Sequence, residues 1–103
     1  MSTLLIVGGD HLGNIERNLM EMGFVDVIHI TGRKVQMVKK DIPERINSIL
    51  VLTDFVNHNL SKSIKQKAKE LALPVFYANR SWSSIQKVLR KNLELDYSMR
   101  MIG

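Results

Sequence analysis

The residues of this chain best able to do chemistry lie at the ends of its apolar segments or just after them. All three histidines have such positions: His11, His29 and His58. Three charged residues share this placement: Asp10, Asp54 and Arg80. Imidazole, carboxylate and guanidinium groups can together supply a metal ligand, a proton acceptor and an anion clamp. Polar residues collect in the loops of any protein, so only their joint pattern indicates a ligand site.

The apolar segments that precede these residues have the character of buried strands. Each is a short, mainly apolar run bounded by turn residues, and the four runs are Leu4–Val7, Val25–Ile30, Ser48–Thr53 and Pro74–Ala78. Such runs are typical of strands that helices cover on both faces. They predict a sheet at the centre of the domain.

Apolar residues recur with helical spacing between these runs. One stripe begins at Ile15, and Asp10 can cap its helix. A later stripe has four inward positions: Leu60, Ile64, Ala68 and Leu71. Ser81 can cap a last helix with three inner residues: Trp82, Ile85 and Leu89. Between Lys34 and Asn47 the helical spacing includes Ile46, but Pro43 divides it into two short helical pieces.

Strands and helices therefore alternate along the chain with short loops between them. This alternation predicts βαβ units with right-handed crossovers, and hence an α/β fold in three layers. We expect a four-stranded parallel sheet in the order 2-1-3-4. The length of 103 residues and a hydrophobic content of 45% predict one domain over residues 1–103.

In an open parallel sheet, ligands bind outside the carboxyl ends of the strands, where the strand order reverses. Here that point lies between the first and third strands. Four loops leave the sheet on this edge, at residues 8–14, 29–33, 53–59 and 79–82. The sequence predicts that these loops form a ligand or cofactor site from eight residues: Gly8, Gly9, Asp10, His29, Arg33, Asp54, His58 and Arg80.

The glycine turn after the first strand matches neither common phosphate-binding form. A dinucleotide fingerprint needs glycine two positions after Gly8, where Asp10 stands, and Gly13 is not followed by the lysine of a P-loop. Asp10 would also repel a phosphate at the helix start. We therefore expect Gly8 and Gly9 to give a tight turn and a close backbone approach.

Two of the histidines are the candidate metal ligands, His58 and His29. His58 is expected at the start of a helix, where Asp54, four residues earlier, either orients its ring or acts only as a cap. His29 shares a strand face with Val27, so a buried, hydrogen-bonded histidine is the alternative. These ligand types suit a divalent metal or haem, but no H-x-x-x-H or H-E-x-x-H spacing occurs. We therefore do not expect the protein to be an enzyme.

Composition constrains the partners and the compartment. The net charge of +5 permits a polyanionic partner, but most of the lysines and arginines fall on outward helix faces, and no aromatic residue lies among a basic cluster. The absence of cysteine excludes disulfides and thiolate sites, and we expect a cytoplasmic protein. No apolar run is long enough to cross a bilayer, and the first residues resemble a strand rather than a signal peptide.

The last residues, 93–103, fit two structures. Four residues alternate with polar ones as in an extra strand: Leu95, Tyr97, Met99 and Met101. Four also fit one face of a helix extension: Leu89, Leu93, Tyr97 and Met101. The apolar side chains of this tail suggest the hypothesis that a second copy of the chain covers it, forming a homo-oligomer.

Several of these segments together resemble one family. They are the first strand with Gly8-Gly9-Asp10, the turn from His29 to Arg33, the motif Thr53–His58 before a lysine-rich helix, and Pro74–Tyr77. Over roughly residues 4 to 90 the chain resembles the bacterial domain-of-unknown-function family 2325. The resemblance implies a small Rossmann-like protein, and a loose association of the family with haem or metal binding would fall here on His58 or His29.

Three functions remain open on this basis. The first is a small-ligand or cofactor binder, with haem or a divalent metal as candidate cofactors. The second is a nucleic-acid or polyanion-binding module that uses the basic helix faces. The third is an enzyme that acts on a phosphorylated small molecule at the same loops.

Overall fold

A computed structural model describes residues 3–31 and 45–91 of the chain. Within this part the strands are β1 (Thr3–Val7), β2 (Asp26–Ile30), β3 (Ile46–Leu52) and β4 (Val75–Ala78). They form one sheet in the order β2-β1-β3-β4, and each neighbouring pair is parallel. The predicted α/β class, parallel sheet and strand order are confirmed, and the arrangement is Rossmann-like.

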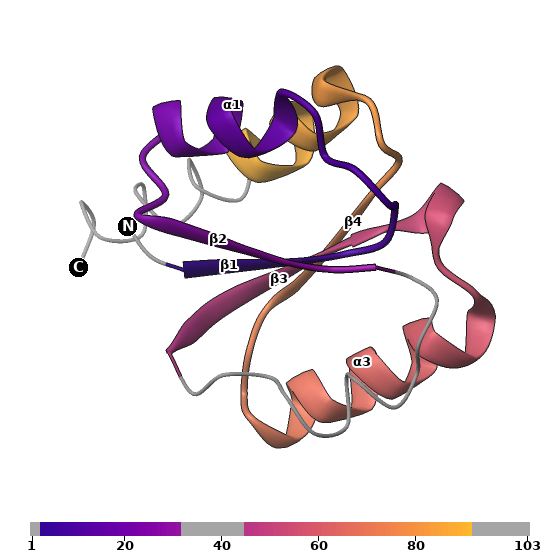
Figure 1. The fold of residues 1–103 in the computed structure, drawn as a ribbon. Coiled ribbons are helices and arrows are strands. Elements are labelled where there is room, and N and C mark those ends of the chain that lie inside the picture. Colours follow the sequence, from indigo (N-terminus) through magenta and orange to yellow (C-terminus); the bar gives the residue numbers. More distant parts are fainter. Residues whose placement is uncertain (1–2, 32–44, 92–103) are drawn as a thin grey trace.

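Helices cover both faces of this sheet (Figure 1). On one face lie α1 (Ile15–Glu21) and a helix that spans residues 82–91. On the other lies α3 (His58–Glu70), which follows the short 3₁₀ helix η1 (Thr53–Phe55). The sheet is therefore the middle of three layers.

Successive side chains of the central strands point to alternate faces of the sheet, and this divides the core into two halves. Leu4 and Ile6 of β1 pack beneath α1 and the helix over 82–91, whereas Leu5 and Val7 pack against α3. Neighbouring side chains of a strand point to opposite faces, so a strand buried on both sides must be apolar throughout. This is why β1 and most of β3 are continuous apolar runs.

Two sequence-based assignments of apolar residues are wrong. Ile46, placed on a helical stripe, begins β3 and pairs with Thr3, and the amide oxygen of Asn47 accepts the backbone N–H of Thr3 at 2.9 Å. Leu71, expected to point inward, is the C-cap of α3 and is 47% exposed. Leu73, beyond the end of the helix, packs against the core instead. The remaining positions of the two short helical pieces, from residue 34 to 44, lie outside the described residues, as does the tail at 93–103.

Candidate functional site

The turn after β1 is packed tightly against the end of β3. Gly8 extends the pairing of β1 with β2, because its N–H donates to the carbonyl of Ile30 at 2.9 Å. Gly8 and Gly9 have φ values of +119° and +77°, which side chains other than glycine rarely adopt. A Cβ on Gly8 would lie 3.1 Å from both the Cβ and the carbonyl oxygen of Leu52. Both glycines are buried, so backbone alone forms this corner of the sheet edge.

His29 of β2 holds this turn in place. Its Nε2 lies 2.8 Å from the carbonyl oxygen of Gly8, and the ring is half-buried. A carbonyl oxygen can only accept, so Nε2 carries the proton and Nδ1 is the nitrogen left for another partner. This is the hydrogen-bonded histidine that the sequence offered as the alternative to a ligand.

Arg80 connects three strand-end loops. It follows β4, and its backbone N–H donates to the Asp54 carboxylate, at 3.0 Å from Oδ1 and 3.3 Å from Oδ2. Its guanidinium donates from Nε, at 3.2 Å, and from Nη2 to the carbonyl oxygen of His11. The same side chain passes 3.8 Å from the Cβ position of Gly9. The loops after β1, β3 and β4 are thus joined at one point.

The expected capping roles of the two aspartates are wrong. The N-cap of α1 is Asn14, four residues after Asp10, and it makes no side-chain cap hydrogen bond. The N-cap of α3 is Asn57, whose amide oxygen accepts the N–H of Leu60 at 2.7 Å. Asp54 lies in η1 and uses its carboxylate on Arg80. The expected cap at Ser81 is confirmed, since its hydroxyl accepts the N–H of Ser84 at 3.1 Å.

The remaining candidates are distributed along the same edge. His58 is the first residue of α3 and is exposed, as are His11 and Asp10. Arg33 lies outside the described residues. Over residues 3–31 and 45–91, no three histidine, aspartate or glutamate side chains come together in a group that could hold a metal ion. The structure therefore brings Gly8, Gly9, His29, Asp54 and Arg80 together through hydrogen bonds and contacts, with His58 at the start of the adjacent helix.

Sequence reasoning missed the partners that organise this edge. The backbone carbonyl of His11, and not its ring, is what Arg80 binds. The guanidinium also lies 3.8 Å from the Cβ position of Gly13. No side-chain pattern could have shown either contact, because each joins segments far apart in the sequence through backbone atoms.

Comparison with known proteins agrees with the resemblance seen in the sequence. A family model described as an uncharacterized protein conserved in bacteria, DUF2325, matches residues 3–92. The chain belongs to the DUF2325 family. The match spans every described strand and helix of this DUF2325 protein. No curated protein and no solved structure was found to match it. None of the helices in its described portion has the length and apolar character needed to cross a membrane.

The bond between Asp54 and Arg80 gives a direct test of how this DUF2325 edge is held. Asp54→Ala is expected to lower the free energy of unfolding by about 1 kcal/mol, because the Arg80 N–H loses an ionised acceptor. Asp26→Ala is the matched control, since the Asp26 carboxylate forms an ion pair with Arg45 at 3.3 Å on an exposed surface. Asp26→Ala is expected to lower the free energy of unfolding by a few tenths of a kcal/mol. Urea unfolding measures both, and equal losses would contradict this role of Asp54.

Proposed function

We propose that this protein binds a small anionic ligand or cofactor at the carboxyl edge of the sheet, over the Gly8–Gly9 turn and beside Arg80. The observation that supports this most is the placement of the Arg80 guanidinium. It lies beside Gly9 and Gly13 of the loop after β1, next to the boundary of β1 and β3, where the strand order reverses. Open α/β sheets bind their ligands at such points.

The chemistry of Arg80 favours an anionic group. A guanidinium has five N–H donors in a fixed plane, and the carbonyl of His11 accepts from only two of its nitrogens, Nε and Nη2. The Nη1 group is oriented by these two bonds, and a planar donor pair suits a carboxylate or a phosphate. The glycines beside it carry no side chain, so a ligand could approach the backbone closely.

The carboxylates of this edge restrict the ligand further. The Asp54 carboxylate accepts the backbone N–H of Arg80, and Asp10 adds a second carboxylate to the loop after β1, so the negative charge of this edge disfavours a polyphosphate. A ligand with few, singly charged anionic groups and an uncharged or cationic remainder fits this charge distribution better. We expect binding rather than catalysis, and we place it in the cytoplasm because the cysteine-free chain gains nothing from an oxidising compartment.

Haem binding is the more specific form of this proposal. Haem carries carboxylates that a guanidinium can bind, and one imidazole is enough to ligate its iron. His58 can supply that imidazole because it is exposed, whereas His29 uses Nε2 on Gly8. The described residues support a single histidine ligand better than a divalent metal held by several side chains.

Matched arginine variants test the proposal. Inorganic phosphate, acetate and haemin are titrated into the wild-type protein, into Arg80→Gln and into Arg45→Gln. Arg45 precedes β3 at the opposite edge of the sheet, so the same chemical change serves there as the control. Arg80→Gln is expected to weaken anion binding by about tenfold or more, and Arg45→Gln to change it less than about twofold.

The outcomes of this titration are distinct. Haemin bound in the wild-type protein should give a Soret band that shifts or disappears in His58→Ala. Failure of all three probes to bind, or equal weakening in the two arginine variants, would contradict an anion site at Arg80. Melting curves for each variant distinguish a lost contact from a lost fold.

A further inference from the structure

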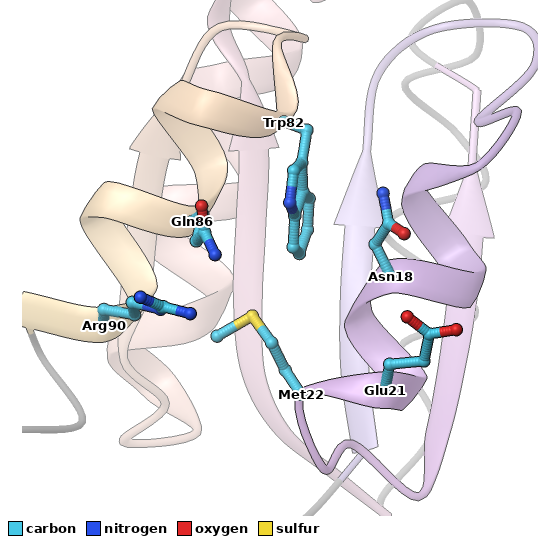
Figure 2. A pocket seen from close by; sticks show the side chains of 6 residues that line it. All are labelled: Asn18, Glu21, Met22, Trp82, Gln86 and Arg90. Carbon is cyan, nitrogen blue, oxygen red and sulfur yellow. The ribbon is translucent and has the colours of Figure 1, made fainter.

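A groove of about 460 Å³ lies between α1 and the helix over residues 82–91. Six residues line it: Asn18, Glu21, Met22, Trp82, Gln86 and Arg90. Figure 2 shows the side chains of Trp82 and Met22 within the space between the two helices. Both are only partly buried, and both pack against the core beneath. The groove thus has an apolar floor between two polar walls.

The two walls of the groove carry opposite charge. Glu21 stands on α1, and Arg90 stands on the facing helix at the same end of the groove (Figure 2). Over residues 82–91 that helix has three basic residues and no acidic one: Lys87, Arg90 and Lys91. On α1 the charged residues are Glu16, Arg17 and Glu21. One wall is therefore net acidic and the other is basic.

We propose that this groove is the interface of a homodimer, in which a second copy of the chain docks through the same two helices. A twofold interface must be complementary to itself, and a surface with one acidic and one basic wall meets that requirement. A twofold axis along the groove places α1 of each copy over the helix 82–91 of the other. Each Glu21 then faces Arg90 of the partner subunit, and the contact occurs twice.

The apolar side chains at the floor of the groove are expected to supply most of the binding energy of the dimer. Tryptophan is enriched among the residues that dominate binding energy, and Trp82 lines the proposed contact. The exposed charges add register and specificity more than affinity. Two short helices per copy give a small interface, so we expect a transient dimer. None of the six lining residues belongs to the proposed ligand site.

Charge reversal in trans tests the interface. Glu21→Arg and Arg90→Glu are made separately, and self-association is measured by sedimentation from roughly 10 μM to 1 mM, the range in which a weak dimer forms. Each single variant places like charges together twice, and its dissociation constant is expected to rise about tenfold or more. An equimolar mixture of the two restores both opposite-charge contacts, so association should return to within about threefold of wild type.

A second readout uses the only tryptophan of the chain, Trp82. Its fluorescence should change with concentration in the wild-type protein and in the mixture, but not in either single variant. Rescue by mixing cannot arise from a contact within one chain, so it distinguishes a dimer from an internal ion pair. A wild-type protein that stays monomeric to about 1 mM would overturn the proposal. So would single variants that associate as well as wild type, or a mixture that does not recover.

Discussion

Replacing Gly8 by alanine is expected to lower the free energy of unfolding by about 3 kcal/mol, the larger of two effects predicted at the glycines of this edge. The φ of +119° is nearly inaccessible to alanine. The new methyl group would also lie 3.1 Å from the carbonyl oxygen and Cβ of Leu52 and 3.3 Å from the carbonyl oxygen of Phe55. These are backbone and stem atoms that cannot rotate away, so the turn must separate from β3.

Gly13→Ala is the matched control. Its φ of +57° is also positive, but the nearest atom to an added Cβ is Nη2 of Arg80 at 3.8 Å, an ordinary van der Waals contact. Conformational strain alone should lower the free energy of unfolding of Gly13→Ala by about 1 kcal/mol. In thermal melts the two variants should fall below wild type by roughly 15 °C and 5 °C, respectively. Equal losses would contradict the close packing of Gly8 against the end of β3.

Leu50→Ala is expected to lower the free energy of unfolding by about 3 kcal/mol, which is the second large effect. Leu50 is fully buried in the middle of β3 and belongs to the core beneath α1 and the helix over 82–91. Truncation removes apolar contacts and leaves a cavity between the sheet and these helices, which can close only in part. Urea unfolding measures the loss, with the slope m expected to be unchanged.

Leu71→Ala provides the comparison, because it is the same substitution at a position that the helical pattern placed inward. Leu71 is 47% exposed, so its truncation should cost less than about 1 kcal/mol. A large loss of unfolding free energy in Leu71→Ala together with a small loss in Leu50→Ala would contradict the burial of Leu50 between the sheet and the helices.

Local patterns predicted the strands and most of the helices. The continuous apolar runs of β1 and β3 follow from burial on both faces, and the hydroxyl of Ser81 does cap the helix that follows it. Those features depend on a few neighbouring residues. Ile46 was misassigned because it fits a helical stripe as well as a strand, and only pairing with Thr3 decides between them.

The sequence predicts which strand ends meet at one edge of the sheet, but it does not predict the contacts between the loops there. The strand order alone predicts that Gly8, Asp54 and Arg80 come to one edge of the sheet. That Asp54 would accept the Arg80 backbone N–H, rather than cap α3, depends on how two loops meet in space. The groove beside Trp82 was likewise missed, because it forms only when two distant helices pack side by side.

The most direct test of the anion site is a ¹H–¹⁵N NMR titration with inorganic phosphate. The proposal predicts that the amide signals of Gly8, Gly9 and Gly13 and the Nε–H signal of Arg80 shift together as phosphate rises to about 10 mM. Shifts confined to the lysine-bearing surface of α3, or no shifts at this concentration, would contradict binding at the carboxyl edge.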